Sequence, residues 1–253
     1  MKNKIQISHT IKPFNKILEI EGDKSLSIRW ILLASQANGK SKSTNLLKSD
    51  DVINSLKCLK KLGVKFKLFK NRCEIIGLGL NGYKYKNNIT LDAGNSGTLG
   101  RLILGLLVHS KKKIKLIGDK SLSKRDFLRV IRPLEKIGAK FNSNSGKLPL
   151  TIEGTKFPKA IKYFETRGSA QCKSSVMLAS LNIKGQTIIK AKKSRDHTEL
   201  LFKYLKLPIK VKKNKNFDII KINGKKKIKP INYRIPSDLS SSSFFIALTA
   251  LSK

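Results

Sequence analysis

The sequence has few acidic side chains. Asp and Glu together number 16, against 54 Lys and Arg in 253 residues, which gives a formal net charge of +38. A charge of this sign and size indicates nucleic acid as one class of partner. Only nine of the basic residues are Arg, however, and the Lys residues are spread along the whole chain. Together with abundant Ile and Asn, this pattern is typical of a codon bias towards A and T at tolerant surface positions. The functional alternative is a positive field that steers polyanionic small substrates.

Cysteine and long apolar runs are also scarce. Cys58, Cys73 and Cys172 have neither metal-binding nor redox spacing, and an odd number of cysteines suits a reducing compartment. The first residues include no hydrophobic segment, so we expect no signal peptide and a cytoplasmic protein. The longest apolar runs, residues 102–108 and 244–251, are too short to cross a bilayer, so we expect no membrane partner.

A unit of about seventy residues occurs three times in the chain and begins a fourth time. Each unit opens on a small polar cluster, and counting from Ser25 gives steps of 71, 74 and 71 residues between the openings. An apolar helix follows each opening, then a strand, a second helix and a hairpin that closes on Gly77, Gly154 or Gly224. The repeat predicts an α/β (α+β) fold of β-α-β-α-β-β units. Because Lys253 comes about one helix into the fourth unit, we expect the chain to be incomplete.

Hydrophobic periodicity and capping residues predict the individual elements. Helices are expected at residues 25–37, 97–108, 125–137, 171–181 and 198–207, and another is expected to be capped by residues 49–51 and to run to residue 62. Strands are expected at residues 43–47, 64–69, 72–76, 89–91, 114–117, 150–152 and 187–189. Asn38 and Gly39 are interpreted as a helix C-cap, and Pro133 as an interruption of its helix.

Arg is placed selectively in a chain that otherwise uses Lys. Arg29, Arg101, Arg125 and Arg195 fall in the first turns of predicted helices, where the helix dipole disfavours a cation. A helix N-terminus combined with an Arg is a strong site for a phosphate or a carboxylate, because the guanidinium offers a bidentate fork. The four residues therefore predict recognition of planar anions, with solvated or structurally paired Arg as the alternative.

Six segments at these helix openings carry a family resemblance. They are residues 22–29, 91–98, 118–125, 169–173, 194–199 and 238–241. In these segments, and in their order along the whole chain, the sequence resembles the 5-enolpyruvylshikimate-3-phosphate synthases, also called 3-phosphoshikimate 1-carboxyvinyltransferases.

The resemblance implies a fold and a division of the chain. The fold is the inside-out α/β barrel of the enolpyruvyl transferases, in which each of two domains holds three repeat units around a pseudo-threefold axis. Residues 1–20 would be a lead-in strand of the far domain. Residues 21–236 would be the near domain, with units at 21–88, 89–160 and 161–236. Residues 237–253 would be the second crossing and the start of the far domain.

The resemblance also implies a reaction. The family transfers the enolpyruvyl group of phosphoenolpyruvate to the 5-hydroxyl of shikimate 3-phosphate and releases phosphate, in the shikimate pathway to aromatic amino acids. The expected partners are these two small molecules, with no metal or organic cofactor and no nucleic acid, and the complete protein is expected to be a monomer. Since the family has further acid/base and anion-binding residues in its second domain, this chain alone is expected to be inactive.

Site residues are carried over position by position. Lys24 would contact both substrates and assist proton transfer. The shikimate 3-phosphate site would comprise Lys24, Ser25, Arg29, Ser169, Ala170, Gln171 and Arg195. The phosphoenolpyruvate site would comprise Lys24, Asn95, Gly97 and Arg125. Lys173 is expected to line the phosphate site. For Thr98 a helix-cap role, and for Arg101 a structural ion pair, are alternatives to binding.

Three positions raise further expectations. Asp126 follows Arg125 where Pro is common in the family, and could pair with it. For His197 a capping or packing role is favoured over a catalytic one. Gly97 predicts that a completed enzyme is sensitive to glyphosate, because the family inhibitor occupies the pocket beside this residue, where a methyl group would crowd it.

Two rival readings remain. The enolpyruvyl transferase that acts on UDP-N-acetylglucosamine shares the repeat fold, but its typical loop Cys is absent from residues 114–125, and its Lys-Asn opening is Lys24-Ser25 here. A basic nucleic-acid-binding repeat protein would explain the charge, and RNA 3′-phosphate cyclases share related unit folds. The unit openings, however, lack the interleaved aromatic residues that stack on bases, and Trp30 is predicted to lie in a helix core.

Overall fold

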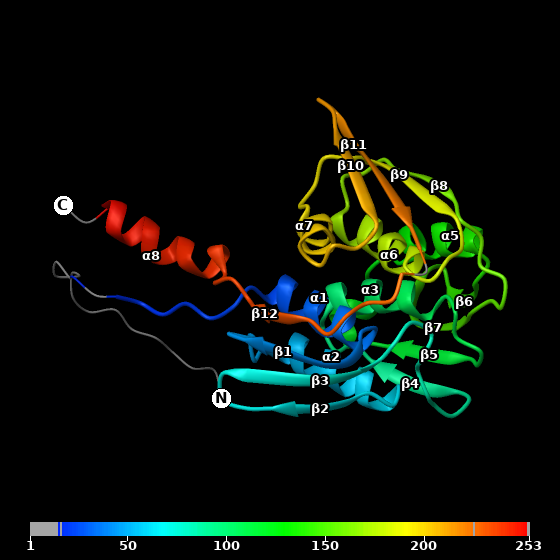
Figure 1. Cartoon of the computed structure of the whole chain (residues 1–253), viewed down its shortest axis with the longest axis horizontal. Coiled ribbons are helices and arrows are strands. Elements are labelled where there is room, and N and C mark those ends of the chain that lie inside the picture. Colours follow the sequence, from blue (N-terminus) through cyan, green and yellow to red (C-terminus); the bar gives the residue numbers. More distant parts are fainter. Residues whose placement is uncertain (1–14, 16, 225, 252–253) are drawn as a thin grey trace.

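The computed structural model describes residue 15, residues 17–224 and residues 226–251, so most of the predicted lead-in segment lies outside the described residues. Three four-stranded sheets surround a set of central helices (Figure 1). The second sheet has the order β4-β5-β7-β6, from β4 (Ile89–Asp92), β5 (Ile114–Ile117), β6 (Lys140–Asn144) and β7 (Lys147–Glu153). The third has the order β8-β9-β11-β10, from β8 (Lys162–Glu165), β9 (Gln186–Lys192), β10 (Ile209–Lys213) and β11 (Phe217–Asn223).

The first sheet repeats this order but takes one strand from the other end of the chain. It comprises β1 (Asn38–Thr44), β2 (Lys65–Leu68), β3 (Arg72–Leu78) and β12 (Asn232–Arg234), in the order β12-β1-β3-β2. β12 pairs in parallel with β1, as β4 does with β5 and β8 with β9. The segment that follows the third hairpin therefore supplies the lead strand of the first unit, and this pairing joins the first and third units.

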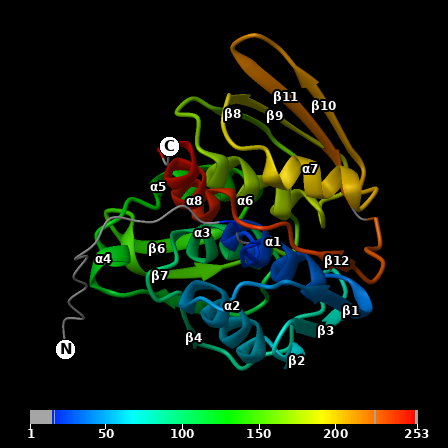
Figure 2. The same ribbon diagram turned by 90° about the vertical axis from the view of Figure 1, so that its left-hand side faces the viewer.

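Three helices form the centre of the molecule. They are α1 (Lys24–Ser35), α3 (Gly97–Leu107) and α6 (Ala170–Ser180), and most of their side chains are buried on every face. Small and apolar residues predominate in all three, as expected for helices that are surrounded by protein. In Figure 2, α1 and α3 lie between the sheet of the third unit, at the top, and the sheets of the first and second units, below. The structure confirms a mixed α/β fold built from repeated units.

The remaining helices are α2 (Asp50–Lys61), α4 (Lys120–Ser123), α5 (Leu128–Ile137), α7 (His197–Tyr204) and α8 (Leu239–Leu251). α2 and α5 each bury one apolar face, as the sequence predicts from their stripes. α8 differs, because none of its described side chains is buried and it projects away from the sheets (Figure 1). Phe244 is 77% exposed and Ile246 57% exposed.

The repeated Gly at the end of each hairpin has a packing reason. A Cβ atom at Gly77 would overlap the carbonyl oxygens of Ala34 and Ala37, at the C-terminal end of α1. Gly154 and Gly224 meet the ends of α3 and α6 in the same way. Only glycine permits so close an approach of strand and helix backbone, and this contact recurs in each unit.

Several predicted boundaries are wrong. Asn38 and Gly39 do not cap α1 but begin β1. The strand expected at residues 43–47 is therefore a seven-residue strand that starts earlier and pairs with β3 along its whole length. The helix expected from Arg125 begins at Leu128, and the short α4 precedes it. Pro133 lies inside α5 without ending it. β8 was missed altogether, since its four residues show no clear alternation before the fold pairs them with β9.

Candidate functional site

A cavity of about 550 Å³ lies where the N-terminal ends of α1, α3, α6 and α7 meet. It is lined by Lys24, Ser25, Arg29, Thr98, Gly168, Ser169, Ala170, Gln171, Ser194, Arg195 and His197. Helix N-termini present N–H groups that have no intrahelical partner and carry a partial positive charge. Four such ends around one cavity, together with three cationic side chains, create a site for an anion.

Short polar side chains fix the helix starts. The Asp23 carboxylate accepts a hydrogen bond from Leu26 N at 2.7 Å and so caps α1. Ser96 caps α3 through Leu99 N, and Ser169 caps α6 through Cys172 N. Each cap satisfies one N–H of the first turn. The polar clusters that open the repeat units in the sequence are therefore the residues that start the helices at the cavity.

All seven residues predicted for the shikimate 3-phosphate site line this cavity. They come from two separate repeat units, the first and the third, and are brought together only by the packing of α1, α6 and α7. The sequence reasoning did not single out Gly168 and Ser194, which also line it. Gly168 has a φ of 68° and so lets the chain turn sharply into α6. A Gly directly before a helix-capping Ser was the signal that could have found it.

Glu165 is a third functional residue that the sequence did not reveal. It lies at the end of β8, is almost fully buried, and accepts hydrogen bonds from Ser169 N at 2.8 Å and Arg167 N at 3.2 Å. A carboxylate that binds two backbone N–H groups holds the turn between β8 and α6 in a single conformation. Glu165 therefore positions the Gly168–Ser169 side of the cavity.

Arg29 is held firmly at the cavity wall. Its guanidinium donates to Thr198 Oγ1 at 2.7 Å, to the Ser25 carbonyl oxygen at 3.0 Å and to Ser174 Oγ at 3.4 Å. Burial lowers the pKa of Arg29 to about 10, and Glu199 opposes this change. The residue is therefore still a cation at neutral pH, and neutral partners leave its charge available to a ligand.

The other cations of the cavity are more exposed. Lys24 forms an ion pair with Asp51 of α2 at 3.1 Å, and Arg195 lies just before α7. The predicted first-turn placement of the four Arg residues is wrong in detail. Arg29 and Arg101 lie in second turns, and Arg125 and Arg195 precede helices.

His197 is the first residue of α7 and also lines the cavity. It is half-buried, and its Nδ1 atom is out of contact with solvent and has no hydrogen-bond partner among the described residues. Burial lowers the pKa of His197 below its ordinary value, and the positive charge of Arg29 lowers it further. Both effects favour the neutral imidazole over the imidazolium.

Lys173, which was expected at the phosphate site, does not line this cavity. It lies on the buried side of α6 and contacts Glu199 of α7 at 2.6 Å, with 1% and 4% of the two side chains exposed. Helical periodicity explains the error, because a residue two positions after Gln171 points to a different face of α6. The pair ties together the two helices whose N-termini line the cavity.

Asn95, Gly97 and Arg125 form a separate group beside the cavity. Arg125 donates to the side-chain oxygen of Asn95 at 3.0 Å, and Asn95 donates to Asp119 at 2.8 Å. A Cβ atom at Gly97 would lie 3.0 Å from Nη1 of Arg125. The three predicted residues are thus neighbours, but unlike Lys24 they do not line the cavity.

Gln171 and Arg101 together connect the two groups, because Arg101 also donates to the Gly97 carbonyl oxygen at 3.4 Å. The Gln171 amide donates to Thr98 Oγ1 at 3.0 Å and accepts from Arg101 at 2.8 Å. Thr98 is therefore not a helix cap, and Arg101 has neutral partners, so the two structural alternatives to binding are not found at these residues. The expected Arg125–Asp126 pair is also not formed, because the Asp126 carboxylate accepts from Leu128 N at 2.7 Å and so helps to begin α5.

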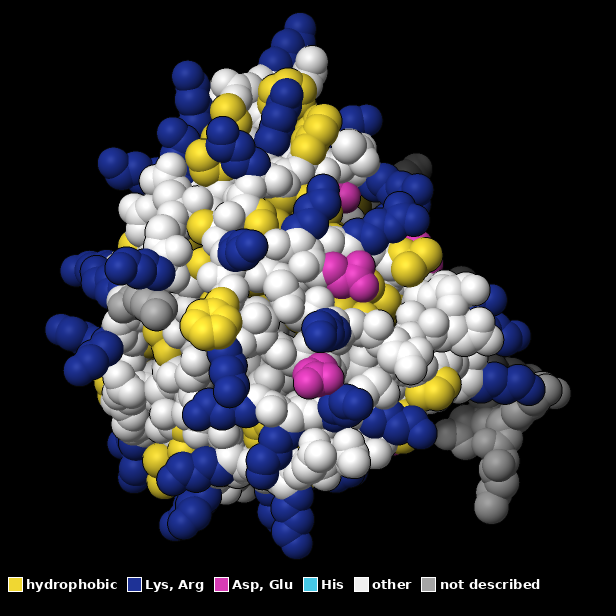
Figure 3. Space-filling view, turned by 90° about the vertical axis from the view of Figure 1, so that its right-hand side faces the viewer, with side chains coloured by type: hydrophobic (Ala, Val, Ile, Leu, Met, Phe, Trp, Pro, Cys, Tyr) yellow, Lys and Arg dark blue, Asp and Glu magenta, His cyan; other side chains and the backbone are white. Residues whose placement is uncertain are grey.

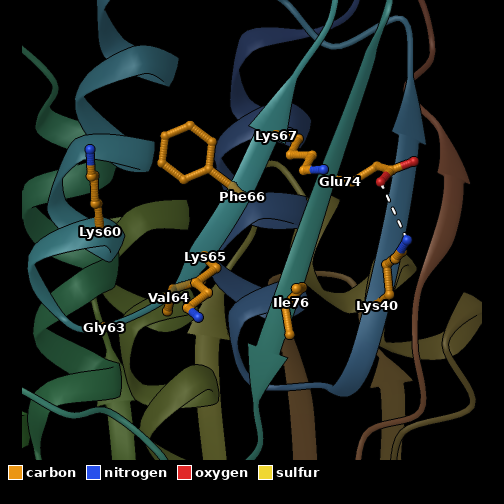
Figure 4. A pocket seen from close by; sticks show the side chains of 9 residues that line it. All are labelled: Lys40, Lys60, Gly63, Val64, Lys65, Phe66, Lys67, Glu74 and Ile76. Atoms are coloured by element: carbon orange, nitrogen blue, oxygen red, sulfur yellow. Dashed lines mark ion pairs between the residues drawn. The ribbon is translucent and has the colours of Figure 1, made fainter.

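A second cavity, of about 620 Å³, lies beside β2 and the C-terminal end of α2 (Figure 4). It is lined by Lys40, Lys60, Gly63, Val64, Lys65, Phe66, Lys67, Glu74 and Ile76. Its carboxylate, on Glu74, already lies 3.6 Å from both Lys40 and Arg72. The lysines extend from exposed strands and from a helix C-terminal end, which does not favour anions. The cavity at the helix N-termini is therefore the candidate site.

Basic side chains are not confined to either cavity. On the face shown in Figure 3, Lys and Arg are distributed over the whole surface and do not gather in one patch. Trp30 is fully buried, which agrees with its predicted place in a helix core. Among the described residues, no helix is long and apolar enough to cross a membrane, and no cluster of three or more His, Cys, Asp or Glu has the geometry of a metal site.

Comparison with known proteins gives consistent matches. The family model described as EPSP synthase (3-phosphoshikimate 1-carboxyvinyltransferase) matches residues 8–253. A 3-phosphoshikimate 1-carboxyvinyltransferase of Ruthia magnifica is 43% identical over 245 residues, which are 95% of this chain and 55% of that protein. One from Persephonella marina is 39% identical over 237 residues, covering 92% and 54%.

The solved structures agree with the sequence relatives. The EPSP synthase of Acinetobacter baumannii superposes with a TM-score of 0.85 at 34% identity, and the match covers 93% of this chain and 53% of that one. The chain thus spans about half the length of the curated relatives it matches.

Proposed function

Because the chain belongs to the EPSP synthase family, we propose that the whole protein transfers the enolpyruvyl group of phosphoenolpyruvate to the 5-hydroxyl of shikimate 3-phosphate and releases phosphate. We propose further that the cavity at the helix N-termini is the shikimate 3-phosphate site. The observation that supports this most strongly is that all seven residues predicted for that substrate line one cavity.

The chemistry of the cavity suits a phosphorylated hydroxy acid. Arg29, Lys24 and Arg195 supply positive charge for a phosphate and a carboxylate, and the helix N-termini add N–H donors. Ser25, Ser169 and Gln171 supply neutral donors and acceptors that suit ring hydroxyls. A site that combines cations with neutral donors and acceptors favours ligands that carry both acidic groups and hydroxyls.

We assign phosphoenolpyruvate to the neighbouring group of Asn95, Gly97 and Arg125. The support is its place beside the cavity, to which it is linked by Arg101, a residue that donates both to the Gly97 carbonyl oxygen and to Gln171. Lys24 would serve both ligands, and in the empty site its ammonium group is paired with Asp51. On ligand binding this pair would open, and the ammonium group could then deliver a proton to a reacting carbon and, as the amine it has become, take one back.

The described site supplies cations but little acid/base chemistry beyond Lys24. We propose that residues 21–236 form one domain and that residues 237–253 begin a second one, which provides the remaining groups. Two facts support this: the chain spans about half the length of its relatives, and α8 exposes its apolar side chains. Turnover by the 253-residue chain alone would contradict the proposal.

The proposal is tested by titrating the chain with shikimate 3-phosphate and, separately, with shikimate, using calorimetry or NMR. We expect binding that depends on the phosphate group and is weakened at least tenfold by Arg195→Ala, since a charge-assisted bond to a phosphate contributes about 1.5–3 kcal/mol. Arg132→Ala is the matched control, because Arg132 is exposed on α5 outside the cavity. Equal weakening by both changes would indicate only the general positive field.

A further inference from the structure

The third sheet has an outer face that combines aromatic rings with lysine side chains. Strand residues alternate between the two faces of a sheet, and the pairing register places every second residue of β8, β9, β10 and β11 on the side away from the core. Two rings, two isoleucines and six lysines lie there: Phe164, Phe217, Ile188, Ile219, Lys162, Lys190, Lys192, Lys210, Lys212 and Lys221. At the top of Figure 3, at the height of β10 and β11 in Figure 1, hydrophobic side chains lie among Lys and Arg.

No carboxylate lies on this face among the described residues of its strands. The two acidic residues of the sheet, Glu165 and Asp218, point inward and are buried. The outer faces of the other two sheets also carry Lys but retain acids, with Glu74 on the first and Asp92 and Glu153 on the second. A general tendency to place Lys at tolerant positions therefore does not account for the missing acids of the third sheet.

The lysines of this face are not confined to the edge strands. β8 and β10 are the edges of the sheet, where Lys prevents pairing with another chain. Lys190, Lys192 and Lys221, however, lie on the interior strands β9 and β11. Lys221 is directly opposite Lys210, and like charges placed in this way destabilise a sheet. An anion bound across these strands would relieve the repulsion.

Both rings of the face contact the same lysine. The ammonium group of Lys190 lies 3.9 Å from the ring centroid of Phe217 and 4.9 Å from that of Phe164. The two rings meet edge to face, with their centroids 6.3 Å apart. Phe164 nevertheless keeps 48% of its surface exposed. The face therefore offers a cation beside an accessible aromatic ring, which is the combination that binds the phosphate and the base of a nucleotide.

We propose that the outer face of the third sheet binds single-stranded nucleic acid, with the phosphates on its lysines and an unstacked base on Phe164. Charge complementarity selects a polyanion. The ring selects a polyanion with free aromatic bases, because the bases of a duplex are stacked on one another. The absence of stacking residues from the unit openings does not bear on this surface, since its rings lie in strands. The surface is separate from the proposed transfer reaction, because none of its residues lines the cavity at the helix N-termini.

The first test removes the ring. Fluorescence anisotropy measures the binding of a labelled oligothymidylate of about 12 nucleotides to the 253-residue chain. Phe164→Ala should weaken binding at least about fivefold, since the stacking of one base contributes about this factor or more. If that variant is unfolded by circular dichroism, Phe164→Leu takes its place.

Phe69→Ala is the matched control for the ring. Phe69 is 40% exposed and has the guanidinium of Arg72 over its ring at 4.3 Å, so its surroundings resemble those of Phe164. It lies, however, at the turn between β2 and β3 of the first sheet. We expect Phe69→Ala to leave the affinity for the oligothymidylate nearly unchanged.

The second test compares two double variants that remove the same charge from exposed lysines. Lys192→Gln with Lys221→Gln changes the third sheet. Lys65→Gln with Lys67→Gln changes the first. Each phosphate contact of a single strand contributes about 0.7 to the slope of log affinity against log salt concentration. We expect the slope to fall by about 1.4 in the first double variant and to change little in the second.

Three results would overturn the inference. Unchanged oligothymidylate affinity in the Phe164 variant would show that no base stacks there. Equal effects of the two lysine pairs would show only the general positive field of the chain. The last concerns other partners: a DNA duplex of the same length, and vesicles of equal parts phosphatidylglycerol and phosphatidylcholine, should both be insensitive to Phe164→Ala. Weaker binding of the variant to the duplex or to the vesicles would indicate a duplex or a lipid surface as the partner instead.

Discussion

Lys173 and Glu199 are the most deeply buried ion pair among the described residues, with almost no solvent contact on either side chain. Neither charged group makes a further hydrogen bond to the described residues. Removing two charges from water is unfavourable, and one short contact offsets this only in part. The pair therefore adds little net stability, yet each partner depends strongly on the other.

This residue-scale argument gives a prediction. Glu199→Gln should lower the free energy of unfolding by about 3–5 kcal/mol, because it leaves the Lys173 ammonium group buried without a counter-charge. The double change Lys173→Met with Glu199→Leu should recover most of this loss. Denaturant titration with a constant m-value measures both effects.

The matched control is the exposed pair between Asp196, the N-cap residue of α7, and Lys213 of β10. Lys213→Met removes a partner of Asp196, where the side chains are 61% and 33% exposed, and should change stability by less than about 1 kcal/mol. Similar losses in Glu199→Gln and Lys213→Met would show that burial does not distinguish the two pairs.

At the scale of elements, the close contacts between hairpin and helix should be sensitive to one added methyl group. Gly224→Ala should destabilise the chain by about 1–3 kcal/mol or more, because its Cβ would overlap the carbonyl oxygens of Ser180 and Ile183. Gly100→Ala is the control. Its Cβ would lie 3.4 Å from the Phe127 ring, and α3 gains helix propensity. Thermal or denaturant unfolding should therefore show a change within about 1 kcal/mol for Gly100→Ala, and equal losses in the two variants would contradict the packing argument.

The elements that the sequence predicted well are those whose signals are local. α3 and β5 lie within one residue of their predicted bounds, because each is a compact apolar run between polar turns. The strand predicted at residues 43–47 shares only its first two residues with β1, since the sequence Asn-Gly-Lys-Ser-Lys-Ser-Thr has little β-propensity and is held by β3 and β12. Tertiary pairing overrides local preference there, and no short window of sequence contains that information.

The candidate site also has a part that the sequence predicts and a part that depends on tertiary packing. Motif matching found the residues around the cavity, but it could not tell that Lys173 faces Glu199 or that Gln171 joins Thr98 to Arg101. These contacts depend on the angle at which α3, α6 and α7 pack. Sequence identifies which helix openings carry the chemistry, and the packing decides which side chains of each opening reach it.

At the scale of the whole molecule, β12 closes the arrangement of three units. Its residues pair with Lys42, Ser43 and Thr44 of β1, and Ile228, Ile231 and Ile235 around it are buried. No local signal in the sequence indicates this pairing, which joins residues about 190 positions apart. Without it, β1 would lose its parallel neighbour, and the first unit would lack the lead strand that the other two units possess.

Two truncations separate the stability contributed by the β12 segment from that contributed by α8. Removing residues 239–253 takes away a helix with no buried side chains, so the unfolding midpoint of the rest should hardly change. Removing residues 228–253 also exposes the surfaces covered by three buried isoleucines. At about 1.5–3 kcal/mol for each side chain, this should destabilise the chain by roughly 5 kcal/mol or more. Since a domain has only about 5–15 kcal/mol of stability, the shorter chain should be largely unfolded by circular dichroism, whereas the longer one folds. Equal stability of the two truncated chains would mean that the three units hold together without β12.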